Sequence, residues 1–249
     1  MKVLAIGNSF SQDATTYLHQ AAAAQGLELT AVNLFIGGCS LETHWSNWER
    51  EAAAYELQIN GRPTGQRVSI QDMLRKGAWD WIVTQQASHD SGWMDTYEPF
   101  LGQLIGQWRK KAPTAQLLLH ETWAYEQGSS HGAFARYHQD QQEMYRRLRA
   151  CYTAMAQTYD LPLIPSGDVF QAVRSLPPFD VQKGGRSLCR DGYHMSYGYG
   201  RYLLACVWLK ALCGTCVANN PFVPESEEAV EPQLLQAIRG AADLVQPCG

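Results

Sequence analysis

The sequence predicts an α/β protein: a three-layer α/β/α sandwich around a five-stranded parallel sheet. Short apolar segments alternate along the chain with amphipathic stretches that are long enough to form helical crossovers. The apolar segments lack alternating polar residues, which is typical of strands buried on both faces. No internal repeat or low-complexity linker interrupts this order, so we expect one domain over residues 1–249.

The first third of the chain begins with a predicted strand at Val3–Ile6, which is apolar and followed by a glycine. Asp13 is expected to cap a helix that runs through Ala24. Leu29–Ile36 is the second strand, and a Trp- and Ala-rich helix follows from Ser40 to about Tyr55.

The middle of the chain interrupts this alternation of strands and helices. The segment Tyr55–Ile70 contains Asn60–Gly61, a hairpin signal, and we interpret it as a small excursion near the site. Trp81–Thr84 is the third strand, and a helix over about Thr96–Lys111 ends before a proline.

The last part of the chain supplies two further strands. They alternate with a long helix, a short helix and an apolar helix, and a helical tail follows. The predicted ranges are strands Ala115–His120 and Leu161–Ile164, and helices Ala133–Tyr159, Val169–Ser175, Ser196–Leu212 and, in the tail, Pro224–Val245. We expect the chain after about residue 215 to be an appendage packed outside the domain.

Composition excludes several classes of protein. Twenty basic and 24 acidic residues give a net charge of −4, and no basic cluster predicts a nucleic-acid partner. The longest apolar run, residues 202–209, is far shorter than a membrane span, so no membrane partner is expected. Seven irregularly spaced cysteines and no export signal favour free thiols and a cytoplasmic protein.

Ligands of open parallel sheets bind beyond the carboxyl ends of the strands, so the residues just after each strand matter most. These residues form short polar or glycine-rich blocks here. The blocks are Gly7–Ser11, Gly37–Ser40, Gln85–Asp90 and Glu121–Trp123, and a later block is Arg190–His194.

These blocks together contain the groups that ester hydrolysis by a serine requires. A hydroxyl must lie at a strand end beside backbone N–H groups, a histidine must take its proton, and a carboxylate must hold that histidine. Ser9 is the hydroxyl in the first block. Asp191 lies three residues before His194, so its carboxylate can accept from Nδ1 and leave Nε2 facing the serine.

The same blocks resemble those of the SGNH (GDSL-like) hydrolases. GNSFSQD, NLFIGGCSLETHW, QQAS and DGYHMSYGYG occur in the family's order and are most similar to a bacterial subgroup described as a domain of unknown function. The resemblance extends over about residues 2–213. It implies the SGNH variant of a flavodoxin-like fold, with no cofactor and no metal.

The resemblance implies a role for each matching residue. Ser9 is the nucleophile, His194 the general base and then acid, and Asp191 the group that orients His194. The backbone N–H groups of Ser9 and Gly38 are two oxyanion-hole donors. Asn8 departs from the family, which has an aspartate before the serine.

The third oxyanion donor is less defined, because the family's Gly-x-Asn-Asp block is QQASHD here. Gln86 can donate through its amide and matches the Gln-Gln-x-Ser form of the subgroup. Counting from Asp80 instead places His89 at the asparagine position, and a neutral imidazole also donates. We favour Gln86.

Two other motifs suggest different chemistry. Gly128–Gly132 matches the Gly-x-Ser-x-Gly elbow of α/β-hydrolases but does not directly follow a strand, so we interpret it as a loop. Cys213 and Cys216 form a CxxC at the end of a helix, where the helix dipole does not lower a thiol pKa.

The sequence therefore predicts a serine esterase that removes acetyl or other short acyl groups from a carbohydrate. Tryptophans and tyrosines expected near the rim would suit stacking on sugars: Trp45, Trp48, Trp93, Trp123 and Tyr125. A lipid or thioester acyl hydrolase is the alternative enzyme. A non-catalytic carbohydrate-binding module on the same fold is the alternative of another class.

Overall fold

The computed structural model describes residues 1–226 and 229–248; residues 227–228 of the predicted tail helix, and residue 249, lie outside the described residues. The described chain forms a seven-stranded sheet in the order β4-β3-β2-β1-β5-β6-β7. The strands are β1 (Lys2–Gly7), β2 (Thr30–Phe35), β3 (Tyr55–Ile59), β4 (Arg62–Val68), β5 (Trp81–Thr84), β6 (Gln116–His120) and β7 (Leu163–Ile164).

The prediction of a purely parallel, five-stranded sheet was wrong. The five expected strands do pair in parallel, but β3 pairs antiparallel with β2, and β4 antiparallel with β3, so the sheet is mixed. Strand β4 could not be recognised from its sequence, because this edge strand is exposed except at Val68 and contains Pro63. The hairpin turn at Asn60 lies beside Ala31, at the amino end of β2 and away from the ligand-binding edge.

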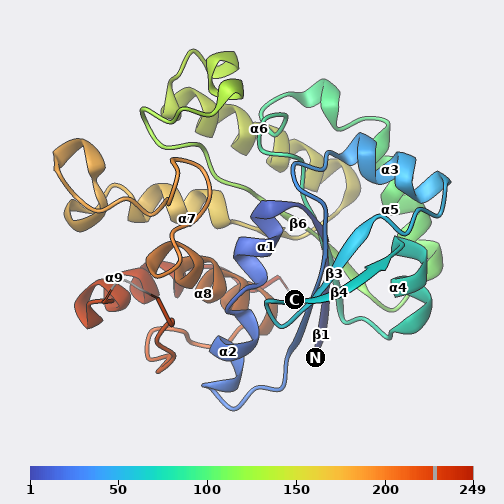
Figure 1. The fold of residues 1–249 in the computed structure, drawn as a ribbon, viewed down its shortest axis with the longest axis horizontal. Helices are drawn as coiled ribbons and strands as arrows, with labels where there is room; N and C mark the ends of the chain where they lie inside the picture. Colours follow the sequence, from blue (N-terminus) through green and yellow to red (C-terminus); the bar gives the residue numbers. More distant parts are fainter. Residues whose placement is uncertain (227–228, 249) are drawn as a thin grey trace.

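Helices cover both faces of the sheet (Figure 1). On one side α1 and α2 pack against α8, with α9 outside it, and on the other α3 packs against α5. The helices are α1 (Ser9–Thr15), α2 (Leu18–Ala23), α3 (Leu41–Glu49), α4 (Ile70–Lys76), α5 (Phe100–Lys111), α6 (Gln141–Tyr159), α7 (Ser166–Val173), α8 (Tyr199–Cys213) and α9 (Pro232–Ala242). Short 3-10 segments lie at Met94–Thr96, Gly132–Tyr137, Pro177–Phe179 and Val181–Lys183.

The start of α1 differs from the prediction in a way that matters for the site. The helix begins directly after β1, because the Asn8 side chain accepts a hydrogen bond from the N–H of Phe10 and caps it. Asp13, predicted as the cap, is instead a fully buried residue within α1. The predicted cap Ser40 is confirmed, since its side chain accepts from the N–H of Thr43.

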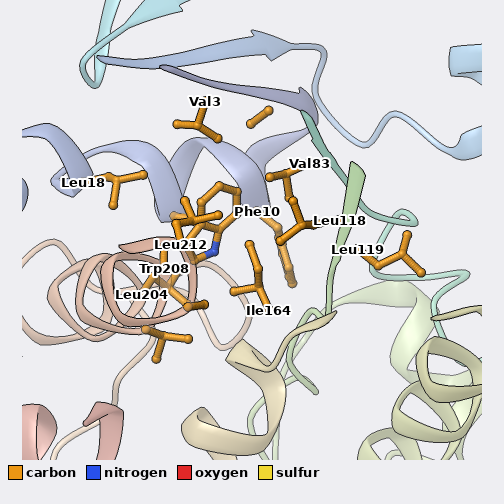
Figure 2. Close-up of a cluster of buried hydrophobic side chains, with 14 of the residues drawn as sticks. Val3, Phe10, Leu18, Val83, Leu118, Leu119, Ile164, Leu204, Trp208 and Leu212 are labelled. Atoms are coloured by element: carbon orange, nitrogen blue, oxygen red, sulfur yellow. The ribbon is translucent and has the colours of Figure 1, made fainter. Parts of the chain in front are cut away.

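The core between the sheet and its α1–α8 layer is formed by large apolar side chains (Figure 2). Phe10 of α1 and Trp208 of α8 lie there, under Val83 of β5. Twelve of the 15 residues of α8 are buried, which explains why this helix is apolar on every side. No helix in the described residues, α8 included, is long and apolar enough to cross a membrane.

Two histidines are also fully buried, His44 in α3 and His120 at the end of β6. Burial lowers the pKa of each ring from 6.5 to about 3. Both rings are therefore neutral in the folded protein at any pH well above 3.

This burial predicts a loss of stability in weak acid. Below pH 6.5 the unfolded chain binds a proton at each histidine that the native protein does not bind, so unfolding becomes easier as pH falls. Each histidine is expected to remove about 1 kcal/mol of unfolding free energy per pH unit between pH ~6 and pH ~4. Urea unfolding at several pH values measures this slope.

The variant His44→Leu should reduce the slope of unfolding free energy against pH by about 1 kcal/mol per pH unit, whatever it does to stability at pH 7. His138→Gln is the matched control, because the His138 ring is 76% exposed. Equal slopes for wild type and His44→Leu would contradict the assignment.

Candidate active site

Ser9, His194 and Asp191 form one hydrogen-bonded chain at the carboxyl edge of the sheet. Ser9 is the first residue of α1, directly after β1 and its cap. Its Oγ lies 2.9 Å from Nε2 of His194, and Nδ1 of the same ring lies 2.7 Å from Oδ2 of Asp191. A carboxylate can only accept, so Nδ1 carries the ring proton and Nε2 is left to accept the serine proton.

The turn that carries Asp191 and His194 is built by the carboxylate itself. Oδ1 of Asp191 accepts from the backbone N–H groups of Tyr193 and His194, at 3.2 and 2.7 Å. Gly192 has φ +85°, and a Cβ there would lie only 3.1 Å from Ser129. Burial raises the pKa of Asp191, but the hydrogen bonds from His194 and Tyr193 outweigh it and hold the pKa below 3.8.

The fully buried carboxylate of Asp13 fixes this turn to α1. Asp13 accepts from Arg190 at 3.1 Å, from Arg201 at 2.7 Å and from the N–H of Met195 at 2.9 Å. On the other side, Trp123 donates from Nε1 to the carbonyl of Tyr193 at 2.7 Å. The histidine is thus placed by contacts before and after it in the chain.

Two backbone N–H groups lie beside the serine and have no hydrogen-bond partner within the described residues. The N–H of Ser9 is the first of α1, and the N–H of Gly38 belongs to the loop after β2. Gly38 has φ +63°, which a residue with a Cβ adopts only at a cost. Ser9 and Gly38 line the same cleft, so their backbone N–H groups are available to a ligand.

The cleft has a volume of about 410 Å³ and a lining that is part polar and part apolar. Its walls come from the loops after β1, β2 and β5, from the Gly128–Gly132 loop and from the histidine turn. The lining residues are Ser9, Phe10, Gln12, Phe35, Gly37, Gly38, Ser88, His89, His131, Arg190, Tyr193 and His194.

Gln86 does not reach this cleft, so the structure does not support it as an oxyanion donor. Its amide nitrogen donates to the carbonyl and hydroxyl of Thr96 at 2.8 and 3.1 Å, and its oxygen accepts from the N–H of Leu41 at 3.0 Å. The Gln86 side chain therefore lies between the start of α3, at Leu41, and the 3-10 segment Met94–Thr96. The alternative residue, His89, lines the cleft.

The aromatic residues predicted for the rim lie elsewhere. Trp123 and Tyr125 are fully buried, and Trp45 and Trp48 line a separate hollow beside α3 and α4. Trp93 is covered by the guanidinium groups of Arg136 and Arg147. The rings that line the cleft are those of Phe10, Phe35, Tyr193 and three histidines.

The Gly-x-Ser-x-Gly motif lies in a loop, and the CxxC motif begins at the last residue of α8. Strand β6 ends at His120, eight residues before Gly128, so the Gly-Ser-Ser-His-Gly segment is a loop and not a strand-to-helix elbow. This loop places His131 in the cleft, against the rings of Tyr125 and Tyr193. All seven cysteines are free.

Several residues that shape the site were not predicted. Gln85 lies buried next to Asn8, His120 lies buried next to Gln85, and the pair of Asp13 and Arg190 holds the histidine turn. One sequence signal was available for the first pair: polar residues at the ends of strands whose other residues are apolar require buried partners.

Comparison with known proteins places the fold. A 1.50 Å crystal structure of a DUF4886 family protein from Bacteroides uniformis matches with a TM-score of 0.90 and 38% identity, over 98% of this chain and 93% of that one. A candidate SGNH hydrolase from Slackia heliotrinireducens matches at 0.57 and 23%, over 84% and 97%. The acetylxylan esterase Axe2 from Geobacillus stearothermophilus matches at 0.55 and 16%, over 84% and 92%.

The two more distant structures show that the chain has the fold of SGNH hydrolases. No curated protein matches the sequence. The model of one family, described as a domain of unknown function (DUF4886), matches residues 2–242, nearly the whole chain. Together with the close relative from Bacteroides uniformis, this match shows that the chain belongs to the DUF4886 family.

Proposed function

We propose that this protein is a serine esterase in which Ser9, His194 and Asp191 are the catalytic residues. The observation that carries the proposal is the chain of hydrogen bonds from Ser9 through His194 to Asp191, which ends beside two unpaired backbone N–H groups. This combination supplies a nucleophile, its base and a site for the negative charge that develops on the carbonyl oxygen.

The proposed reaction follows from the tautomer of His194. Nε2 takes the proton of Ser9 as Oγ attacks the ester carbonyl, and Asp191 stabilises the imidazolium that forms. His194 then gives the proton to the departing alcohol, which leaves an acyl group on Ser9. Water, deprotonated at the same Nε2, attacks the acyl-enzyme. The acyl–Oγ bond then breaks, the acid is released, and Nε2 returns the proton to Oγ of Ser9.

The N–H groups of Ser9 and Gly38 hold the oxyanion in this mechanism. Of the two side chains considered as a third donor, His89 is the one left facing the cleft, because the Gln86 amide is bonded to Thr96. We therefore assign the third donor to His89.

The proposed substrate is a short acyl ester, most specifically an acetyl ester, of a carbohydrate. The cleft around Ser9 is small, and Gln12, Ser88 and Arg190 place polar groups beside its aromatic rings, a combination that suits a hydroxyl-bearing alcohol better than a long acyl chain. The shared fold with an acetylxylan esterase supports the same class of ester.

Replacing Ser9 tests the nucleophile. Ser9→Ala is expected to lower kcat on 4-nitrophenyl acetate by about 10³-fold or more, because only water remains to attack. Ser130→Ala is the matched control, since Ser130 is exposed in the Gly128–Gly132 loop, and it should keep wild-type turnover. Full activity of Ser9→Ala, with loss in Ser130→Ala, would instead favour the elbow.

Replacing Asp191 by its amide tests how His194 is oriented. In Asp191→Asn the amide can donate to the ring and favour the wrong tautomer, so kcat should fall by about 10⁴-fold with a smaller change in KM. Asp95→Asn removes the same charge from an exposed position and should have little effect. A loss of less than tenfold in Asp191→Asn would argue that Asp191 is not the orienting residue.

The substrate class is tested with a panel of esters. Acetate should be turned over much faster than octanoate, and acetylated xylose or xylo-oligosaccharides faster than 4-nitrophenyl acetate in kcat/KM. Preference for octanoate or a thioester would point to a lipid or thioester acyl hydrolase. Binding of glycans without release of acetate from any substrate would point to a binding module.

A further inference from the structure

A buried line of polar side chains crosses the carboxyl ends of four neighbouring strands under the candidate site. His120 is the last residue of β6, Gln85 directly follows β5, Asn8 directly follows β1, and the line ends at the carbonyl of Cys39 after β2. The successive distances are 2.6 Å from His120 Nδ1 to Gln85 Oε1, 2.9 Å from Gln85 Nε2 to Asn8 Oδ1, and 3.0 Å from Asn8 Nδ2 to the Cys39 oxygen. All three side chains are at most 2% exposed.

The direction of every hydrogen bond in this line follows from its last member. A backbone carbonyl can only accept, so the group of Asn8 that faces Cys39 must be the NH₂. The Asn8 oxygen then accepts from the N–H of Phe10 and from the Gln85 amide. The Gln85 oxygen must in turn accept from a proton on Nδ1 of His120.

The far end of the line agrees with this direction. Nε2 of His120 lies 3.0 Å from the hydroxyl of Ser166, which can donate to an unprotonated nitrogen. Burial keeps the ring neutral, since it lowers the pKa of His120 to about 3. Trp208 packs edge-on against the ring at 4.9 Å and prevents it from turning away.

Asn8, in this line of side chains, is bonded to both segments that carry the proposed oxyanion donors. Through one side chain, Asn8 binds the N–H of Phe10, next to Ser9, and the carbonyl of Cys39, next to Gly38. The distance between the two donors therefore depends on how Asn8 is held. Gln85 supplies the remaining hydrogen bond to Asn8, and His120 fixes which end of the Gln85 amide faces Asn8.

We propose that Gln85 and His120 are positioning residues that set the spacing of the oxyanion hole by orienting the amide of Asn8. This inference rests on the proposed function, since it assigns a role in the same site. It also explains asparagine at position 8: an aspartate there could not donate to the Cys39 carbonyl and would place two oxygens about 3 Å apart.

The direction of the line can be measured on the wild-type protein. Long-range ¹H–¹⁵N correlation spectra of histidine-labelled protein at pH 7 distinguish the two neutral tautomers, and His120→Asn identifies the signal. The expected state is a neutral ring with its proton on Nδ1. The other tautomer, or a charged ring, would overturn the proposal without reference to any substrate.

The positioning role can be measured with a matched pair of variants. His120→Asn keeps an N–H donor near the place of Nδ1, whereas His120→Leu has a similar volume and no donor. Per active serine, titrated with a fluorophosphonate, His120→Leu and Gln85→Leu should lower kcat for an acetate ester by about 10- to 100-fold at little-changed KM. His120→Asn should recover most of that loss.

Equal losses in His120→Asn and His120→Leu would show that only packing matters and would overturn the proposal, as would wild-type kcat in Gln85→Leu. If wild-type protein hydrolyses no ester, the proposed function fails, but the rate of fluorophosphonate labelling at Ser9 still reports the oxyanion hole. If the leucine variants do not fold, the tautomer of His120 and the labelling rate of His120→Asn decide.

Discussion

The candidate site depends on the hydrogen bonds and ion pairs made by the buried carboxylate of Asp13. It is fully buried, and a carboxylate removed from water costs several kcal/mol unless it is paired and hydrogen-bonded. Arg190, Arg201 and the N–H of Met195 provide those partners from a part of the chain about 180 residues away. Satisfying this one charge therefore brings the turn that carries His194 against the helix that begins with Ser9.

The line from His120 to Cys39 complements this pairing on the other side of Ser9. Asp13 fixes the position of His194 relative to Ser9, and Asn8 fixes the position of the loop that contains Gly38 relative to Ser9. Both networks start from α1, the first helix of the chain, and both consist of groups that become unpaired if the helix shifts. The position of the short helix α1 therefore determines the positions of all the proposed catalytic groups.

The sequence was sufficient to predict the parallel strands, because each is a short apolar segment that must be buried. It also predicted that Ser9, Asp191 and His194 lie together, because Ser9 follows a strand end and Asp191 precedes His194 by three residues. It did not predict β4, whose exposed residues carry no burial pattern. It also misplaced Gln86, because which face a residue takes after a strand depends on where the strand ends. The partners of Asp13 and Asn8 were beyond reach, since long-range polar pairing leaves no periodic signal.

The outer strands of the sheet have a consequence for association. An unpaired strand edge invites pairing with another chain, and β4 discourages this with Pro63, the charged residues Arg62 and Arg67, and an irregular register with β3. At the opposite edge β7 has only two residues, and Cys248 of the C-terminal tail contacts the carbonyl of Leu163. Both edges therefore disfavour pairing with a strand of another copy, and contacts between copies of this protein are expected to use helices and loops.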